Sequence, residues 1–316
     1  MQKKPLIILT GPTAVGKSSL SISLAKRIKG EIISADSMQV YKGMDIGTAK
    51  IKEDEMEGVP HYLIDLIDPD QEFNVVKFQE YAKLYMNDIY NRGKTPIIVG
   101  GTGFYIQSIL YDIDFTKAKQ DNSYREQLEQ VVKEEGKESL YKILLAIDEE
   151  SAKLIHQNNI KKIIRAIEFY YQTGNKISEH NKEQKAKDSP YNFQCFVLNK
   201  ERQELYKGIE KRVDTMIEEG LIEEVKGLFN KGFDNNLISM QGLGYKEILA
   251  YLKGEYSLDE AIYILKRDTR HFAKRQLTWF KREGDVNWIN KDDFDNDSMV
   301  IDYILKELLT NKVIEL

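Results

Sequence analysis

Residues 11–18 carry the clearest chemical signal in the chain, a G-x-x-x-x-G-K-[ST] run. The apolar segment PLIILT precedes this run and the amphipathic segment SSLSISLAKRI overlaps its end. A strand and a helix in this order direct backbone N–H groups toward an anion at a helix N-terminus. The alternative, a tight glycine turn that binds nothing, explains neither Lys17 nor Ser18. The pattern therefore predicts a phosphate-binding loop, formed by Gly11, Pro12, Thr13, Ala14, Val15, Gly16, Lys17 and Ser18.

The two polar residues at the end of this loop have distinct expected roles. Lys17 would reach the outer phosphate oxygens, and the Ser18 hydroxyl would ligate a phosphate-bound Mg²⁺. The loop alone does not indicate which phosphorylated compound is bound.

Asp36 is the best candidate for a catalytic base. It ends the second apolar run, EIISAD, and open parallel sheets bind ligands at the carboxyl ends of their strands. A carboxylate there can accept a proton from an attacking nucleophile while Lys17 and Mg²⁺ neutralise the leaving phosphates. The alternative is that Asp36 only caps the segment that begins at Ser37.

The third apolar run, TPIIVGG, lacks the carboxylate that an NTP hydrolase needs at the end of a neighbouring strand. It ends in Gly100, Gly101 and Thr102 instead. A dinucleotide-binding fingerprint is also disfavoured, because Ile106 stands where the third glycine is required. Group transfer on a phosphorylated substrate is therefore favoured over hydrolysis.

The elements that position these residues follow from the hydrophobic pattern. Short apolar runs at residues 5–10, 31–36, 95–101, 193–198 and 286–289 predict strands, and helical patterns separate them. Such an arrangement is typical of a parallel sheet covered on both faces. The helix expected before the third run places Phe78, Tyr81, Tyr85 and Ile89 on one face.

The middle of the chain differs in character. Residues 116–190 are rich in Lys and Glu with helical spacing, and the polar stretch at 178–192 is typical of a loop. We therefore expect an α/β core at residues 1–115 and 191–316, interrupted by a helical insertion at 116–190, with a weakly patterned acidic tail.

Composition restricts the class of protein. The 316 residues are 41% hydrophobic and 31% charged, with a net charge of −5, as in a soluble globular protein. No apolar run approaches the length of a membrane span, and the N-terminus predicts no signal peptide. The only cysteine, Cys195, excludes an internal disulfide and a thiolate zinc cluster, which favours a cytoplasmic location.

Two helical segments present basic faces. Lys161, Lys162 and Arg165 lie opposite an isoleucine stripe. The second segment, residues 265–282, holds Lys266, Arg267, Arg270, Lys274, Arg275, Lys281 and Arg282 against the single acid Asp268. One such face is usually only solvated, but two in an acidic protein favour a polyanionic macromolecular substrate. His61 and His156 lack the neighbours of a metal site and are expected to be structural.

Together these motifs resemble the bacterial tRNA dimethylallyltransferases, also called tRNA isopentenyltransferases. The resemblance covers residues 7 to about 290, through GPTAVGKS, ISADSMQVYKGMDIGTAK, PHYLIDLIDP, IIVGGTGFYI, IIRAIEFY, QGLGYKE and AKRQLTWFKR. It implies a P-loop kinase-like parallel sheet core with an inserted helical domain. It also implies transfer of the dimethylallyl group of dimethylallyl diphosphate to N6 of the adenosine 3′ of the anticodon.

The resemblance assigns roles to individual residues. Asp36 is implied as the base, Thr102 as a neighbour of the reacting centre and Arg212 as a diphosphate ligand. Lys161 and Lys162 replace arginines frequent in relatives, which keeps the charge but loses bidentate geometry. The tRNA contacts implied are Asp36, Ser37, Met38, Gln39, Thr102, Arg125, Ile160, Lys161, Lys162, Ile163, Ile164, Arg165, Gln241, Lys274 and Arg275.

Three other functions remain open from the residues alone. A P-loop small-molecule kinase would place ATP in the loop and use Asp36 to deprotonate a hydroxyl, but leaves the basic faces unexplained. An adenylate isopentenyltransferase would use the same donor on a free nucleotide. A non-catalytic RNA-binding protein leaves Lys17, Ser18 and Asp36 without a purpose. The partners we expect are the anticodon stem-loop of tRNA, dimethylallyl diphosphate and Mg²⁺, and the enzyme is expected to act as a monomer.

Overall fold

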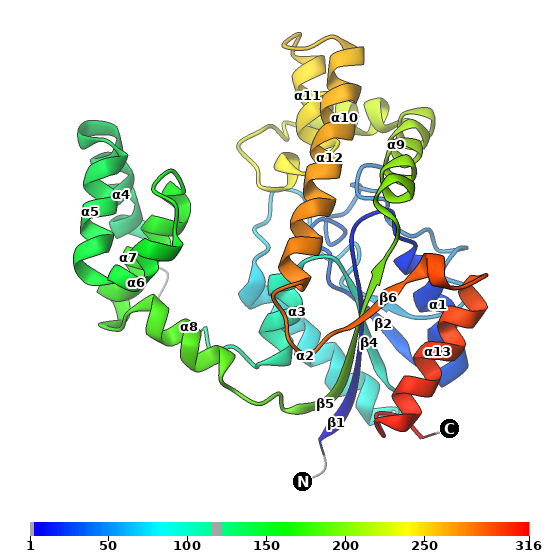
Figure 1. Ribbon diagram of the computed structural model, residues 1–316. Helices are drawn as coiled ribbons and strands as arrows, with labels where there is room; N and C mark the ends of the chain where they lie inside the picture. Colours follow the sequence, from blue (N-terminus) through cyan, green and yellow to red (C-terminus); the bar gives the residue numbers. More distant parts are fainter. Residues whose placement is uncertain (1–2, 116–121, 316) are drawn as a thin grey trace. The chain divides into compact units, whose positions relative to one another are not determined.

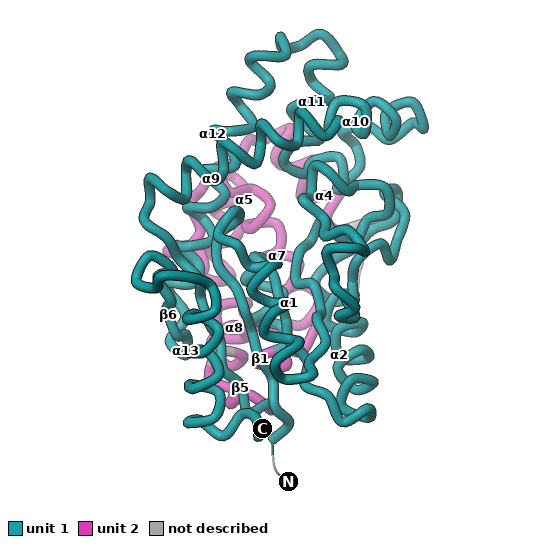
Figure 2. The backbone as a smooth tube through the Cα atoms, turned by 90° about the vertical axis from the view of Figure 1, so that its right-hand side faces the viewer, with its two compact units in different colours: residues 1–109, 191–316 teal, residues 110–190 magenta. Residues whose placement is uncertain are grey.

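The protein is described by a computed structural model that covers residues 3–115 and 122–315. The chain forms two compact units, one of residues 1–109 and 191–316 and one of residues 110–190 (Figure 2). We call them the α/β unit and the helical unit. Residue 116, where the sequence pattern predicts the start of the insertion, lies outside the described residues.

The α/β unit is built on a six-stranded sheet in the order β3-β2-β4-β1-β5-β6 (Figure 1). Every pairing between neighbouring strands is parallel. The strands are β1 Lys4–Thr10, β2 Glu31–Ser34, β3 His61–Tyr62, β4 Pro96–Gly100, β5 Tyr191–Asn199 and β6 Asn287–Asn290. The predicted parallel α/β core is confirmed. The short strand β3 was not predicted, because two residues carry no periodic signal.

Helices cover both faces of this sheet. On one face α1 (Lys17–Ile28) and α13 (Asp297–Thr310) pack with Ile7 and Leu9 of β1 into one hydrophobic cluster. Helix α2 (Val75–Asn91), in the connection from β3 to β4, lies on the opposite face (Figure 1). Helix α13 lies in the acidic tail, whose pattern looked weak in sequence, although Ile304 and Leu308 are fully buried.

The buried face of α2 differs from the expected one. Phe78 and Ile89 are buried as predicted, but Ala82 and Met86 complete the stripe. Tyr85 is only half-buried and stacks on Tyr62, with ring centroids 4.7 Å apart. Tyr81 and Tyr85 therefore border the core, whereas Phe78 is fully buried in it.

The described part of the α/β unit contains further helices. They are α3 Gly103–Leu110, α9 Arg202–Glu218, α10 Leu221–Asn230, α11 Tyr245–Leu252 and α12 Leu258–Phe280, with single 3₁₀ turns at Ser239–Gln241 and Lys291–Asp293. Some of these helices have a side chain that caps their N-terminus. Ser257, for example, forms a capping box with Glu260 at the start of α12.

The helical unit contains α4 Asn122–Glu135, α5 Lys137–Ile147, α6 Glu149–Leu154, α7 Ile160–Thr173 and α8 Ile177–Lys185. Its core joins Leu128, Leu140 and Leu144 to the buried side of α7. The prediction of a loop over residues 178–192 is wrong, since α8 covers most of it and β5 begins at Tyr191. Polar residues, among them Ser178 and Gln184, occupy the buried positions of α8, so no apolar period marks the helix.

No helix among the described residues combines the length and apolar character needed to cross a bilayer.

Candidate functional site

The loop predicted to bind phosphate connects β1 to α1 at the carboxyl edge of the sheet. Gly11 has φ +141° and Gly16 has φ +92°, a region that favours glycine. A Cβ at Gly11 would lie 2.4 Å from the Leu198 carbonyl oxygen on β5. Both glycines of the motif are therefore required by geometry, the first also by the close neighbouring strand.

The Lys17 amine folds back over this loop. Its Nζ donates to the carbonyl oxygens of Gly11 and Pro12, at 3.0 and 2.8 Å. Burial and the positive charge of Arg212 lower the pKa of Lys17 to about 7, and the negative charge of Asp36 opposes this shift. A bound anion would stabilise the charged amine, so Lys17 is suited to receive a phosphate group.

Arg212 reaches the loop from α9. Its Nη1 donates to Thr13 Oγ1 at 3.2 Å. Burial lowers the pKa of Arg212 from its usual value, and Asp36 opposes that shift as well. The structure thus brings Lys17, Arg212 and Asp36 into one charged group from three different elements.

Asp36 lies two residues beyond the end of β2 and has a capping role. Its Oδ1 accepts hydrogen bonds from the backbone N–H groups of Met38 and Gln39, at 2.8 and 3.4 Å. The capping alternative considered from the sequence is therefore real. It does not exclude a second role, because the same carboxylate also influences Lys17 and Arg212 electrostatically.

The turn between β4 and α3 places Thr102 next to the end of β2. The Thr102 N–H donates to the Ala35 carbonyl at 3.2 Å. A Cβ at Gly100 would lie 2.3 Å from the same carbonyl oxygen. The glycine therefore allows the close approach that sets Thr102 beside the segment carrying Asp36.

The segment of residues 36–50, which we call the 36–50 loop, is held by residues that the sequence did not indicate. The Glu224 carboxylate accepts from the N–H groups of Asp45, Ile46 and Gly47, at 2.9, 2.8 and 3.1 Å. Tyr245 donates its hydroxyl to the same carboxylate at 2.6 Å. We call this contact of Glu224 the clamp. In the sequence, Glu224 looks like any acidic residue on a surface helix, so the clamp could not be predicted.

Within the 36–50 loop, polar side chains are largely engaged. Lys50 is buried and pairs with Asp45 and Asp65. Gln39 accepts from Ser34 Oγ and donates to the carbonyls of Thr48 and Ala49. The Gln39 amide thus serves the loop itself in this structure.

The basic residues of α12 fall into two groups. Lys266, Arg267 and Arg270 form ion pairs with Asp214, Asp268 and Glu210, respectively. Lys274 and Arg275 are exposed, and within residues 3–115 and 122–315 neither has an ion-pair partner. The second group therefore has more charge available for an external polyanion.

The residues of the helical unit that were predicted to bind tRNA also fall into an exposed and a buried group. Lys161, Lys162 and Arg165 are exposed on α7. Ile163 and Ile164 are 0% and 3% exposed and pack in the helical core, so their side chains lie away from the exposed basic residues of α7. Their assignment to tRNA binding stays a prediction.

The other assigned positions have less distinctive surroundings. Ile160 is half-buried beside the helical core, and Arg125 lies 3.4 Å from the buried Glu168. Gln241, in the 3₁₀ turn of the α/β unit, donates to the Asn235 carbonyl. Ser37 and Met38 are half-buried.

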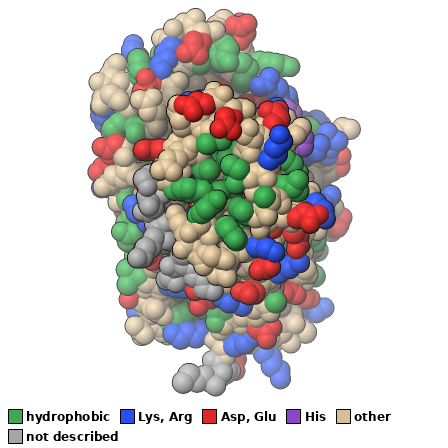
Figure 3. Space-filling view, turned by 90° about the vertical axis from the view of Figure 1, so that its left-hand side faces the viewer, with side chains coloured by type: hydrophobic (Ala, Val, Ile, Leu, Met, Phe, Trp, Pro, Cys, Tyr) green, Lys and Arg blue, Asp and Glu red, His purple; other side chains and the backbone are tan. Residues whose placement is uncertain are grey.

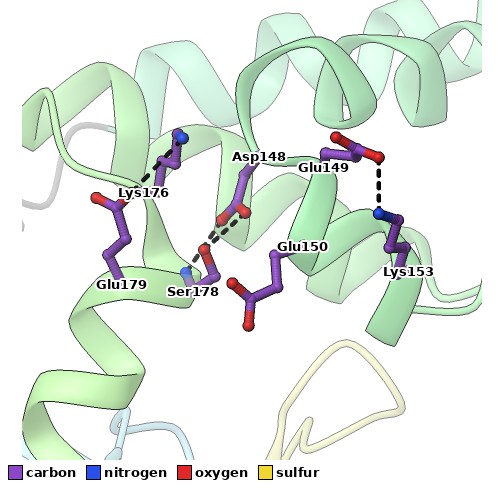
Figure 4. A pocket seen from close by; sticks show the side chains of 7 residues that line it. All are labelled: Asp148, Glu149, Glu150, Lys153, Lys176, Ser178 and Glu179. Atoms are coloured by element: carbon purple, nitrogen blue, oxygen red, sulfur yellow. Dashed lines mark hydrogen bonds and ion pairs between the residues drawn. The ribbon is translucent and has the colours of Figure 1, made fainter.

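A cavity of about 410 Å³ lies in the helical unit among Asp148, Glu149, Glu150, Lys153, Lys176, Ser178 and Glu179 (Figure 4). Its charges are satisfied within the unit. Asp148 accepts from the backbone N–H and hydroxyl groups of both Ser151 and Ser178. Lys153 and Lys176 pair with Glu149 and Glu179. The contacts of Asp148 join the ends of α6 and α8, so the polar side chains around the cavity are explained by their role in holding the helical unit together.

One face of the molecule shows apolar side chains gathered at its centre, with Lys and Arg scattered around them (Figure 3). Asp and Glu side chains lie among them, so this view shows no continuous basic patch.

Comparison with known proteins gives a consistent result. Residues 39–283 match the sequence model of a family described as IPP transferase. A tRNA dimethylallyltransferase of Lachnoclostridium phytofermentans is 58% identical over 312 residues, which are 99% of this chain and 100% of the relative. A second, from Acetivibrio thermocellus, is 52% identical over 94% of this chain and 95% of the relative.

Solved structures agree. The tRNA isopentenylpyrophosphate transferase of Bacillus halodurans is similar with a TM-score of 0.74 and 43% identity, covering 98% of each chain. A eukaryotic dimethylallyltransferase, captured acting on tRNA, has a TM-score of 0.84 at 30% identity and covers 98% of this chain and 80% of its own.

Proposed function

The chain belongs to the IPP transferase family, as its motifs predicted, and we propose that it dimethylallylates adenosine 37 of tRNA. The donor is dimethylallyl diphosphate, the acceptor is N6 of the adenosine 3′ of the anticodon, and the tRNAs are those that read codons beginning with U. The observation that carries this proposal is the convergence of Lys17, Arg212 and Asp36 at the carboxyl edge of the sheet.

The reaction is a substitution at the allylic carbon C1 of the donor. The bond from C1 to the diphosphate oxygen breaks, a bond from C1 to N6 forms, and pyrophosphate leaves. Lys17, Arg212 and the backbone N–H groups of the phosphate loop stabilise the charge that develops on the leaving oxygens. The lowered pKa of Lys17 supports this role, because an incoming diphosphate would supply negative charge beside the buried amine.

Asp36 accepts the proton that N6 loses. The exocyclic amine of adenine is a weak nucleophile, since its lone pair is delocalised into the ring, so proton removal assists the attack. Ser37, Met38 and Gln39, which follow Asp36, hold the extruded base in this proposal, and Thr102 lies close to the reacting atoms.

The residues present fit a Mg²⁺ ion that arrives with the diphosphate. Within the part of the chain that the structure describes, no three His, Cys, Asp or Glu side chains group into a metal site. The exposed Ser18 hydroxyl offers a single oxygen ligand, which suits an ion bound mainly by substrate oxygens and water. Such an ion would supply further charge neutralisation of the diphosphate.

The tRNA-binding surface is proposed on two groups of exposed basic residues. Lys161, Lys162 and Arg165 form one, and Lys274 and Arg275 form the other. Because the proposed donor site is built from a single chain, we also propose that the enzyme acts as a monomer in the cytoplasm.

One assay tests the proposed activity. The protein is incubated with dimethylallyl diphosphate, Mg²⁺ and unmodified tRNA, and N6-alkylated adenosine is sought in the digested tRNA by mass spectrometry. Parallel reactions with AMP as acceptor, and with ATP as donor, test the adenylate isopentenyltransferase and kinase alternatives. Alkylation of AMP but not tRNA, or phosphate transfer from ATP, would contradict the proposal.

A further inference from the structure

Gln276 of α12 connects two parts of the donor site that are far apart in the sequence. Its Oε1 accepts from the Thr13 N–H of the phosphate loop at 2.9 Å. Its Nε2 donates to the Gly101 carbonyl, in the turn before Thr102, at 3.1 Å. An amide is the side chain that can accept at one end and donate at the other, so the two bonds engage both ends of the group.

The backbone next to α12 leaves space for the buried Gln276 side chain. The residue is only 7% exposed, on a helix whose other buried positions include Ala273 and Phe280. A Cβ at Gly101 would lie 2.0 Å from Gln276 Nε2, and a Cβ at Gly103 would lie 2.3 Å from the Trp279 ring. The turn therefore approaches α12 so closely that two glycines are needed to admit these side chains.

A buried amide without partners would destabilise the fold, whereas an apolar residue could fill the same space. A buried amide at position 276 is therefore explained if its two hydrogen bonds hold parts of the donor site in place. Thr13 belongs to the loop proposed to bind the diphosphate, and it also accepts from Arg212. Thr102 follows the other bonded residue, Gly101, and lies beside the segment that carries Asp36.

We infer that Gln276 is a positioning residue for the donor site, which fixes the phosphate loop against the turn that carries Thr102. This inference rests on the proposed function, because the loop must bind the diphosphate for its position to matter. Gln276 acts through Thr13 and Gly101, and nothing in its role requires contact with tRNA. The neighbouring Lys274 and Arg275, on the exposed side of the same helix, are proposed for that contact.

The first test is Gln276→Met, which keeps a similar side-chain volume and removes both hydrogen bonds. We expect the KM for dimethylallyl diphosphate to rise about 30-fold, the fold-change that two ordinary hydrogen bonds represent, with the Kd for tRNA unchanged. Binding of inorganic pyrophosphate with Mg²⁺, measured by calorimetry, should weaken by a similar factor. An unchanged pyrophosphate Kd and donor KM in the folded variant would overturn the inference.

The second test is Gln276→Glu, which keeps the acceptor for Thr13 but cannot donate to Gly101 when ionised. We expect a larger rise in donor KM than for Gln276→Met, because a negative charge is added beside the diphosphate loop. Protonation restores a donor and removes the charge, so the ratio of variant to wild-type KM should fall as pH is lowered toward 5. A ratio independent of pH would contradict the assigned bond to Gly101.

Thr269→Val provides a matched control. Thr269 lies seven residues earlier on the buried side of α12 and is 8% exposed. Its hydroxyl donates only within its own helix, to the Leu265 carbonyl at 2.7 Å. Its donor KM should match that of the wild type, and an equal defect in both variants would assign the effect to general packing. Failure of the wild-type protein to alkylate tRNA would reject the proposed function, whereas a normal Gln276→Met variant would reject only this inference.

Discussion

The phosphate loop and the 36–50 loop both border the proposed reacting centre, but they are shaped by different kinds of contact. The phosphate loop takes its form from its own glycines and from the return of Lys17 to the carbonyls of Gly11 and Pro12. The 36–50 loop takes its form from Glu224, which is 177 to 179 residues away from the three N–H groups that it binds. The first loop is therefore set mainly by its own residues, with distant side chains bonded only at Thr13, whereas the second loop is held by a residue that only the assembled fold brings near.

This difference predicts separable effects. Changes in the phosphate loop should affect the donor and the leaving group, whereas changes at the distant clamp should affect how the adenosine is held. Variants that mix the two effects would contradict the separation.

The largest effect is expected for Asp36→Asn. The Asn oxygen can still accept from Met38 and Gln39, so the cap is kept, but the amide cannot take a proton at neutral pH. The single-turnover rate at saturating tRNA should fall by about 10²–10⁴, with donor and tRNA binding within a few-fold of wild type. Near-normal chemistry in this variant would leave Asp36 with the capping role alone.

Lys17→Ala is expected to reduce turnover by about 10²–10³ and to weaken donor binding, with tRNA affinity nearly intact. The wild type should also show a pH dependence that this variant lacks. Burial lowers the pKa of Lys17 to about 7 in the free protein, and a bound diphosphate raises it again.

The sign of the pH dependence follows from proton uptake on binding. Above pH 7 a growing fraction of the free enzyme has a neutral Lys17, so the pyrophosphate Kd of the wild type should rise by up to about tenfold per pH unit. Calorimetry between pH 6.5 and 9 measures this slope. An equally steep slope in Lys17→Ala would assign it to another group.

Glu224→Gln tests the distant clamp. The amide places an N–H₂ group against backbone donors, and each unsatisfied donor is worth about 1–3 kcal/mol of stability. We expect a lower thermal midpoint and a KM for tRNA raised about tenfold, with pyrophosphate binding unchanged. Glu223→Gln, at the exposed neighbouring position on α10, is the control and should behave as wild type. Loss of pyrophosphate binding in Glu224→Gln would show that the two loops are coupled.

The smallest effect is expected for Lys274→Gln, on the exposed side of α12. If Lys274 contacts the RNA backbone, the slope of log affinity against log salt should fall by about 0.7–0.9. Lys266→Gln is the matched control, because Lys266 already pairs with Asp214 at 2.6 Å and should change the slope less. Equal slopes for both variants would remove Lys274 from the interface.

Sequence patterns predicted those features whose causes lie within a few residues. The phosphate loop follows from glycine spacing, and the strands β1, β2, β4, β5 and β6 follow from continuous apolar runs. The family motifs also identified the reaction class. Helix α8 was not predicted, because its buried residues are polar. The periodicity of Ile163 and Ile164 predicted an apolar helix side, and both side chains are buried in the helical core.

The sequence by itself therefore determined the local frame of the site: a strand, a glycine loop with Lys17 and Ser18, and Asp36 after the next strand. Only the tertiary structure decided which distant side chains complete it. Gln276 meets Thr13 and Gly101 across 263 and 175 residues, and Arg212 meets Thr13 across 199. A hydrogen bond between residues so far apart leaves no periodic trace in either segment, because each partner alone resembles an ordinary polar residue. Their roles emerge only when the parallel sheet brings the ends of its strands to one edge and the following helices close over them.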